Sequence, residues 1–210
     1  MSYEYRRMTP EERKATIDER RQHGYPLHSP PHPYREAGWY CITAANYEHL
    51  PVMADTARIA ALEDLLLLEL AAAQVEVGGW VIVPNHYHIL VGVQSLEQIS
   101  AVLKHVHGKT ARAWNLEDGF TGRRTVWYRF RDRCIRDEQH YYHALNYIHY
   151  NAAKHAYVES PYDWPWCSVH LYFDTHGRQW LRERWVQYPV GDAWDYGDQA
   201  TEVATTGVRS

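Results

Sequence analysis

The stretch Val81-Ile-Val-Pro-Asn-His-Tyr-His-Ile-Leu-Val91 predicts two strands joined by a very short connection. Residues typical of strands stand on both sides of Pro84-Asn85, and this dipeptide is typical of a turn. The surrounding pattern extends the first strand back to position 75 and the second forward to position 93. A pair of neighbouring strands is therefore predicted near the middle of the chain.

Further regular elements are predicted on both sides of this strand pair. Apolar residues recur at helical spacing in the helices expected before and after it, and a later segment alternates as a strand does. The first six elements match the α+β plan of a ferredoxin-like split βαβ fold, an antiparallel sheet with helices on one face. The predicted segments are strand 39–45, helix 55–73, strands 75–83 and 87–93, helix 96–115, strand 126–135 and helix 138–155.

Extensions are predicted at both ends of this core. Thr9 and Pro10 suit the start of a short helix that runs to about Gln22, and a connector rich in Pro and His follows it. After Pro161 the periodic pattern gives way to segments rich in Pro, Asp, Gly and Trp. The predicted organisation is an N-terminal helix and extended connector over 1–36, a central domain over 37–158 and an irregular tail over 159–210.

Composition and charge limit the class of protein. Hydrophobic residues make up 45% of the chain, enough for a core, and three scattered cysteines form no disulfide framework or CxxC site. The chain has no apolar run of membrane-spanning length and no apolar leader, so a cytoplasmic location without membrane contact is expected. Net charge is −4, but nine basic against four acidic residues lie within 101–137. Such a stripe can bind a phosphate backbone, although a solvated mixed-charge face has the same pattern.

His86 and His88 form a candidate metal site. Two residues apart in a strand, their side chains project from the same face, so both imidazoles can bind one divalent ion. The alternative is chance, because a chain with 14 histidines contains some such pairs. His105 and His107 are also two apart, but they lie in a predicted helix, where such side chains diverge.

A second cluster lies in the predicted helix over 138–155. Tyr147 and Asn151 are four apart and share one helical face, with His143 a turn before and Lys154 a turn after them. A tyrosine oxygen can attack phosphorus and later leave as a phenolate, provided that cations stabilise the phosphate oxygens. The alternative is an amphipathic helix whose tyrosines pack at the edge of the core.

Residues suited to nucleic acid accompany these two clusters. Lys104 and Lys154 are candidate phosphate contacts, and a basic track is predicted where arginines alternate along the strand over 126–135. Two aromatic residues beside that track are candidates for stacking on unpaired bases, with packing in the core as the alternative. The proposed DNA-binding residues are Arg129, Arg131, Arg133, Trp127 and Tyr128.

Together the two clusters resemble a known family. Val83-Pro-Asn-His-Tyr-His-Ile-Leu, followed by Tyr147-Ile-His-Tyr-Asn-Ala-Ala-Lys, resembles the single-tyrosine HUH transposases, most closely the REP-associated tyrosine transposases. The similarity covers roughly 38–172. Two departures touch the helix end: Ala152-Ala153 replaces the family's Pro-Val, and Ala156 replaces a usual glycine.

The resemblance implies a site and an activity. Tyr147 is the implied nucleophile, and His86, His88 and Asn151 are the implied ligands of Mg²⁺ or Mn²⁺, with His143, Lys104 and Lys154 as possible supporting residues. The implied partner is single-stranded DNA whose palindromic repeats form hairpins, cleaved through a 5′-phosphotyrosine intermediate by a nucleoid-associated monomer or homodimer. Two alternatives stay open: a metallophosphoesterase with a water nucleophile, and a non-catalytic hairpin-binding regulator.

Overall fold

The computed structural model describes residues 9, 11, 12, 14, 15, 18, 37–122 and 124–190. The chain divides into two units, 1–35 and 36–210. In the first unit the Glu12 N–H donates to Thr9 Oγ1 (3.2 Å) and the Thr9 N–H donates to the Glu12 carboxylate (2.7 Å). This reciprocal capping box confirms that a helix begins at Thr9. The predicted connector to residue 36 lies outside the described residues.

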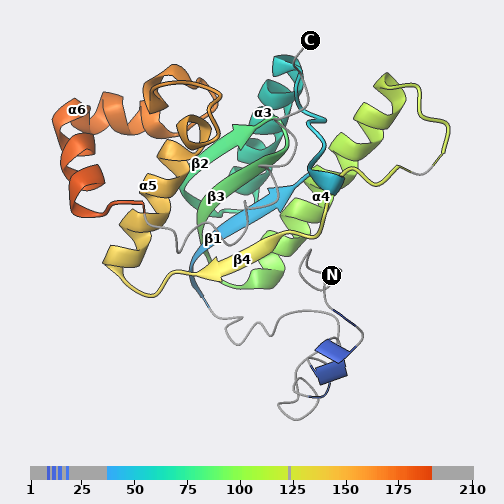
Figure 1. The fold of residues 1–210 in the computed structure, drawn as a ribbon, viewed down its shortest axis with the longest axis horizontal. Coiled ribbons are helices and arrows are strands. Elements are labelled where there is room, and N and C mark those ends of the chain that lie inside the picture. Colours follow the sequence, from blue (N-terminus) through green and yellow to red (C-terminus); the bar gives the residue numbers. More distant parts are fainter. Residues whose placement is uncertain are drawn as a thin grey trace. The chain divides into compact units, whose positions relative to one another are not determined.

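The second unit is built on a four-stranded antiparallel sheet with strand order β2-β3-β1-β4 (Figure 1). α3 connects β1 to β2 and α4 connects β3 to β4, so the order of elements is that of the predicted ferredoxin-like split βαβ fold. The apolar residues that recur at helical spacing in α3 are all buried: Ile59, Leu62, Leu66 and Leu70. The elements are β1 (Gly38–Ala45), α3 (Thr56–Ala72), β2 (Glu76–Val83), β3 (His86–Val93), α4 (Leu96–Glu117) and β4 (Arg131–Cys134).

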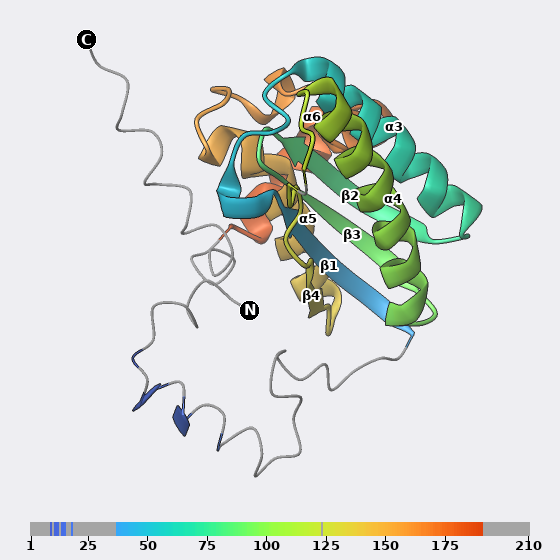
Figure 2. The same cartoon turned by 90° about the vertical axis from the view of Figure 1, so that its right-hand side faces the viewer.

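Helices cover both faces of this sheet. Side chains such as Ile42 and Ile89 point to one face, where they form a core with α3 and α4, which lie side by side in Figure 2. On the other face Cys41 and Leu90 form a second core with α5 (Glu138–Lys154) and α6 (Val169–Gln187). The prediction of helices on one face of the sheet therefore holds for α3 and α4, whereas α5 covers the opposite face. None of the helices in the described ranges is long and apolar enough to cross a membrane.

Two glycines of β2 determine how closely α5 approaches the sheet. A Cβ atom at Gly79 would lie 2.7 Å from Leu145 Cδ1, and one at Gly78 would overlap the Tyr141 hydroxyl. A β-bulge between Val77 and Gly79 accompanies this approach. The paired glycines thus allow α5 to pack directly on β2, beside the histidine-bearing strand β3.

The predicted irregular tail is wrong for residues 169–187, which form α6. Gly177, with a φ of 82°, interrupts the helical conformation, and this break obscures the periodicity that buries Val169 and Leu181. Before α6, the chain lies against the outer edge of β2. The Ile82 N–H donates to the Trp166 carbonyl (3.0 Å), and the Ser168 N–H donates to the Trp80 carbonyl (2.9 Å). Residues 191–210 of the predicted tail lie outside the described residues.

The last strand of the sheet is shorter than predicted. β4 spans Arg131–Cys134, whereas the pattern predicts a strand over 126–135. Val126 and Trp127 pair instead with residues that follow β1. The Tyr47 N–H donates to the Val126 carbonyl (2.8 Å), and Trp127 forms an isolated antiparallel β-bridge with Asn46. The first half of the predicted strand therefore pairs irregularly with the end of β1 and the residues that follow it, and only the second half forms β4.

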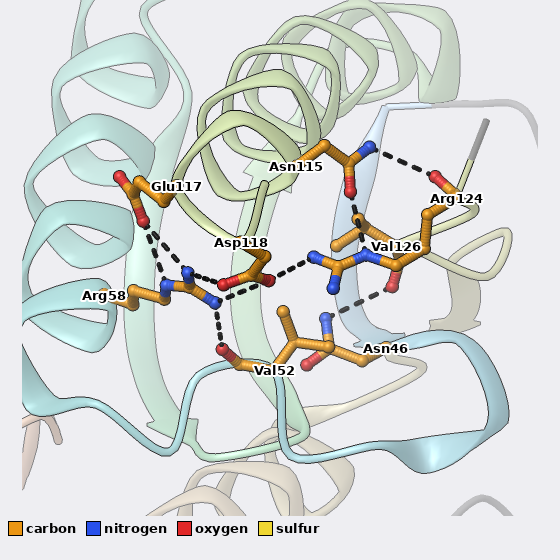
Figure 3. Close-up of polar contacts among 8 residues, drawn as sticks. All are labelled: Asn46, Val52, Arg58, Asn115, Glu117, Asp118, Arg124 and Val126. Atoms are coloured by element: carbon orange, nitrogen blue, oxygen red, sulfur yellow. Dashed lines mark hydrogen bonds and ion pairs between the residues drawn. The ribbon is translucent and has the colours of Figure 1, made fainter. Parts of the chain in front are cut away.

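A polar network holds the segment that leads to Val126 in place (Figure 3). Arg58 at the start of α3 donates to Glu117 (3.1 Å), to Asp118 and to the Val52 carbonyl (3.0 Å). Arg124 donates to the same Asp118 carboxylate (2.6 Å). Hydrogen bonds from these two guanidinium groups hold the pKa of Asp118 below its ordinary value. The network therefore joins the end of α4 to the loop before α3 and to the segment that leads to Val126.

Candidate active site

The histidine pair lies at the start of β3, on the face that α5 covers. His88 pairs with Thr43 of β1, and His86 pairs with Ala45. Their ring centroids are 4.9 Å apart, and each residue is only 2% exposed. The strand therefore brings the two imidazoles together, as their spacing of two predicts.

Each imidazole has a hydrogen-bond partner at its Nδ1 atom. His86 Nδ1 lies 2.7 Å from Asn85 Oδ1, and His88 Nδ1 lies 2.8 Å from Thr43 Oγ1. Metal-binding histidines in proteins are commonly held in this way, with one ring nitrogen oriented by a neighbour and the other directed to the ion. The arrangement thus fits a pair of ligands that would bind through Nε2.

The surroundings of both rings disfavour the charged imidazolium form. Burial, together with the nearby His155, Lys154 and Arg133, lowers the pKa of His88 to about 3. Burial and the neighbouring His88 also lower the pKa of His86 well below its ordinary value. Neutral imidazole is the form that binds a metal ion.

α5 places Tyr147 and Asn151 against this pair. Tyr147 Oη lies 3.5 Å from His88 Nε2, and the two ring centroids are 5.0 Å apart. Tyr147 is 2% exposed, and Asn151 is fully buried. The Asn151 amide lies close enough to His86 to raise the pKa of that ring slightly against the effect of burial. In the described part of the chain, however, neither polar atom of this amide makes a hydrogen bond of standard geometry. The predicted nucleophile and all three predicted ligands are therefore neighbours.

The third ligand position depends on this amide. No group of three His, Cys, Asp or Glu side chains in the described ranges has an arrangement that could hold a metal ion. A buried amide without a regular hydrogen bond is costly unless another group satisfies it. The side-chain oxygen of Asn151 fits the remaining ligand, because carbonyl oxygens suit Mg²⁺ and Mn²⁺.

Cationic side chains border the same site. The Lys154 ammonium lies 5.0 Å from the centroid of the Tyr147 ring. Arg131 pairs with Thr43 and Arg133 with Cys41, so both arginines share the sheet face of His88. α5 packs mainly on β2, at the opposite edge of the sheet from β4. The two arginines therefore extend the site along the half of the face that α5 covers least.

Two predicted supporting residues lie away from this cluster. Lys104 is exposed on α4, which packs on the opposite face of the sheet. His143 lies one turn before Tyr147, and its Nδ1 atom is 3.0 Å from the Pro189 carbonyl, which follows α6. The structure therefore brings Lys154, but neither Lys104 nor His143, to the histidine pair.

The proposed DNA-binding aromatic residues differ in their surroundings. Trp127 stacks on His107 (centroids 4.4 Å apart, rings 11° from parallel), and its Nε1–H donates to Thr110 Oγ1 (3.0 Å), so packing in the core accounts for it. Tyr128 is half-buried, and its ring centroid is 4.9 Å from that of Tyr47. Arg129 is exposed just before β4.

Sequence reasoning missed three neighbours of the histidine pair. Asn85 and Thr43 bind the two Nδ1 atoms, and the His155 ring centroid lies 5.1 Å from that of His86. His155 follows Asn151 by four positions, a helical spacing that would have pointed to it. Asn85 is adjacent to His86 in the motif, whereas only strand register could have pointed to Thr43.

The fold and the site define an α+β protein in which a buried histidine pair of a central strand faces a helix-borne tyrosine and amide. No protein-family model matches the chain. Over 97 residues it is 27% identical to the REP-associated tyrosine transposase of Escherichia coli K12, covering 45% of this chain and 54% of the relative. It is 31% identical over 98 residues to a putative REP-associated tyrosine transposase of Haemophilus influenzae, covering 42% and 56%. The chain thus spans about half the length of these curated relatives.

A solved structure of a REP-associated tyrosine transposase bound to a REP hairpin has the same fold. The TM-score is 0.57 at 20% sequence identity, and the match covers 71% of this chain and 88% of that chain. Together, the relatives and the shared fold support the resemblance that the two motifs indicate, to the REP-associated tyrosine transposases.

Proposed function

We propose that the chain is a metal-dependent endonuclease and strand transferase that acts on single-stranded DNA at hairpin-forming palindromic repeats. One observation carries the proposal: Tyr147 Oη lies 3.5 Å from His88 Nε2, although the two residues are 59 positions apart in the sequence. The names of the curated relatives and the hairpin in the solved structure support this substrate.

The proposed reaction is a transesterification at phosphorus. Tyr147 Oη forms a bond to the scissile phosphorus, the bond from phosphorus to the 3′-oxygen breaks, and the tyrosine proton passes to that 3′-oxygen, directly or through solvent. The products are a 5′-phosphotyrosine and a free 3′-hydroxyl. Because one phosphodiester replaces another, the reverse step can rejoin DNA ends without ATP.

The residues present fit a divalent cation. The imidazoles of His86 and His88 and the side-chain oxygen of Asn151 would hold Mg²⁺ or Mn²⁺, which supplies positive charge to the non-bridging phosphate oxygens. The Lys154 ammonium, which lies over the Tyr147 ring, adds attraction for the phosphate and for a developing phenolate. Because Tyr147 is 2% exposed, neighbouring side chains must move for the phosphate to reach Oη.

The DNA strand is proposed to run along the β4 side of the sheet. Arg131 and Arg133 share the face of His88 there, so they can bind phosphates next to the scissile one. The overall charge of −4 does not oppose this binding, because the local surface sets the potential that a strand meets.

The experiment is detection of the covalent intermediate. Labelled single-stranded DNA carrying palindromic hairpins is incubated with the protein and Mn²⁺ and resolved on denaturing protein gels. We expect a metal-dependent band of protein joined to DNA, lost in Tyr147→Phe and in the presence of chelator. Tyr150→Phe is the matched control, because Tyr150 lies on the same helix but packs against Trp185 (centroids 4.7 Å apart).

Other results would replace the proposal. Cleavage that persists in Tyr147→Phe, without an adduct, identifies a phosphoesterase with a water nucleophile. If the protein binds hairpins equally well with and without chelator, and neither cleavage nor an adduct is seen, it is a non-catalytic binding protein.

A further inference from the structure

Both ends of the Asn85 side chain are hydrogen-bonded. Asn85 is the second residue of the Pro84-Asn85 connection between β2 and β3, and it is 7% exposed. Its Nδ2 atom donates to the His49 carbonyl (3.3 Å), and its Oδ1 atom lies 2.7 Å from His86 Nδ1. The side chain therefore links the turn after β1 to the first residue of the histidine pair.

These two contacts determine the orientation of the amide. A backbone carbonyl only accepts hydrogen bonds, so the amide atom that faces His49 is the nitrogen donor. The oxygen then faces His86, and because an amide oxygen only accepts, His86 Nδ1 must carry the proton. A neutral imidazole has a single N–H, so the Nε2 atom of His86 holds a lone pair.

The turn that supplies the His49 carbonyl is strained. Glu48 and His49 have φ angles of 57° and 54°, in the left-handed region that residues other than glycine rarely occupy. Hydrogen bonds anchor the turn: the Tyr47 N–H donates to the Val126 carbonyl (2.8 Å), and the Asn46 N–H donates to the Asn85 carbonyl (2.8 Å). Strain of this kind persists only where the surroundings enforce it, and it is concentrated at functional sites.

The second histidine is held differently. Thr43 Oγ1, the partner of His88 Nδ1, is a hydroxyl and can either donate or accept. That contact leaves the tautomer of His88 open, so of the two Nδ1 partners Asn85 is the one that specifies a tautomer.

We propose that Asn85 is a positioning residue that holds His86 in the Nδ1–H tautomer and so presents the Nε2 lone pair to a divalent cation. The tautomer follows from the hydrogen bonds alone, whereas its use in metal binding rests on the proposed function. Without the Asn85 acceptor, His86 can place its proton on Nε2, and that proton must be displaced before a metal binds.

Nitrogen-15 NMR of the histidine rings in the full-length, metal-free protein tests the tautomer directly. The His86 signals are assigned by their loss in His86→Gln. We expect protonated Nδ1 and unprotonated Nε2 in the native protein. A protonated Nε2 in the native protein would overturn the proposal, and this result needs no Asn85 variant.

Two substitutions then isolate the acceptor. Asn85→Asp and Asn85→Leu both remove the donor to His49, but only Asp keeps an oxygen acceptor for His86. We expect Asn85→Asp to keep the Nδ1–H tautomer and Asn85→Leu to populate the Nε2–H tautomer, with Mn²⁺ affinity lowered about 10- to 100-fold. Calorimetric titration with Mn²⁺ measures the affinity, and thermal melting shows that each variant folds.

The remaining outcomes separate this inference from the proposed function. If Asn85→Leu folds and matches Asn85→Asp in tautomer and in Mn²⁺ affinity, Asn85 has no positioning role. If the tautomer and the Mn²⁺ affinity both depend on Asn85 but no DNA is cleaved, the proposed function fails and the role of Asn85 stands.

Discussion

The residues of the candidate site are polar but almost completely buried. His86, His88, Tyr147 and Asn151 are each no more than 2% exposed. Burial of such groups costs free energy unless they are bonded to one another or to a ligand. In the described part of the chain the Asn151 amide makes no hydrogen bond of standard geometry, so its burial lowers the stability of the metal-free protein, and a bound cation would offset part of that cost.

Another histidine, His107, makes stability depend on pH. It lies on the α4 face of the sheet, where its Nε2 atom is 2.7 Å from the Tyr87 hydroxyl. Burial lowers the pKa of His107 from 6.5 to about 4. Between these two pH values the unfolded chain binds a proton at this residue that the folded protein does not. This contribution to stability is therefore fully present above pH 6.5 and is lost as the pH falls towards 4.

We predict that His107→Gln flattens the pH dependence of the unfolding free energy in this range. The slope of the unfolding free energy against pH should fall by as much as about 1.4 kcal/mol per pH unit, which corresponds to one proton. Urea unfolding at a series of pH values measures the slope. A slope equal to that of the native protein would mean that His107 titrates alike in the folded and unfolded states.

The parts of the site that could be predicted from the sequence depend on local geometry. A spacing of two on a strand places His86 beside His88, and a spacing of four on a helix places Tyr147 beside Asn151. Thr43 could not be found in this way, because its contact with His88 depends on the register between β1 and β3. The surroundings of Trp127 were equally hidden, since they depend on how α4 packs on the sheet.

Among the helices, α3, α4 and α5 end in the same type of cap. After each of them, two N–H groups donate back into the last turn, and the first residue beyond the cap has a positive φ. Gly119 holds this position after α4, whereas Gln74 and Ala156 hold it after α3 and α5. Ala156, with a φ of 57°, therefore keeps the backbone geometry that the family's glycine favours, but with the backbone strain that a Cβ atom causes in this conformation.

We predict that Ala156→Gly stabilises the protein by about 1 kcal/mol, because glycine removes the strain. For a chain of this length the melting temperature should rise by about 2 to 4 °C, as measured by calorimetry. Gly119→Ala is the converse control: an added Cβ would meet no atom within 4 Å, so its cost is backbone strain alone. A lower melting temperature for Ala156→Gly would show that the alanine methyl group contributes packing that outweighs the strain.

Element prediction succeeded where amphipathic patterns were continuous and failed where they were interrupted. The four buried residues of α3 at helical spacing made that helix predictable. Gly177 interrupted the pattern of α6, and the expected strand over 126–135 lost its first half to hydrogen bonds with Asn46 and Tyr47. Those partners belong to a turn that the sequence does not reveal.

For the whole molecule, a cation at the site should stabilise the fold. A ligand that binds only the folded state adds about 2.7 kcal/mol at 100 times its dissociation constant, which corresponds to a rise of about 5 to 10 °C in melting temperature. We predict such a rise with Mn²⁺ and its reversal by chelator, both measured by differential scanning calorimetry. In Asn151→Ala the difference between the two conditions should shrink, whatever the substitution does to the metal-free protein. An undiminished difference would place the cation elsewhere.

The two edges of the sheet have a consequence for self-association. One edge, β2, is already occupied by the segment around Trp166–Ser168. The other edge, β4, is only four residues long and carries Arg131, Asp132 and Arg133. Exposed strand edges are templates for fibre growth, and short, charged edges resist it. Within the described part of the chain, the sheet therefore offers no long apolar edge on which a second copy could nucleate amyloid-like aggregation.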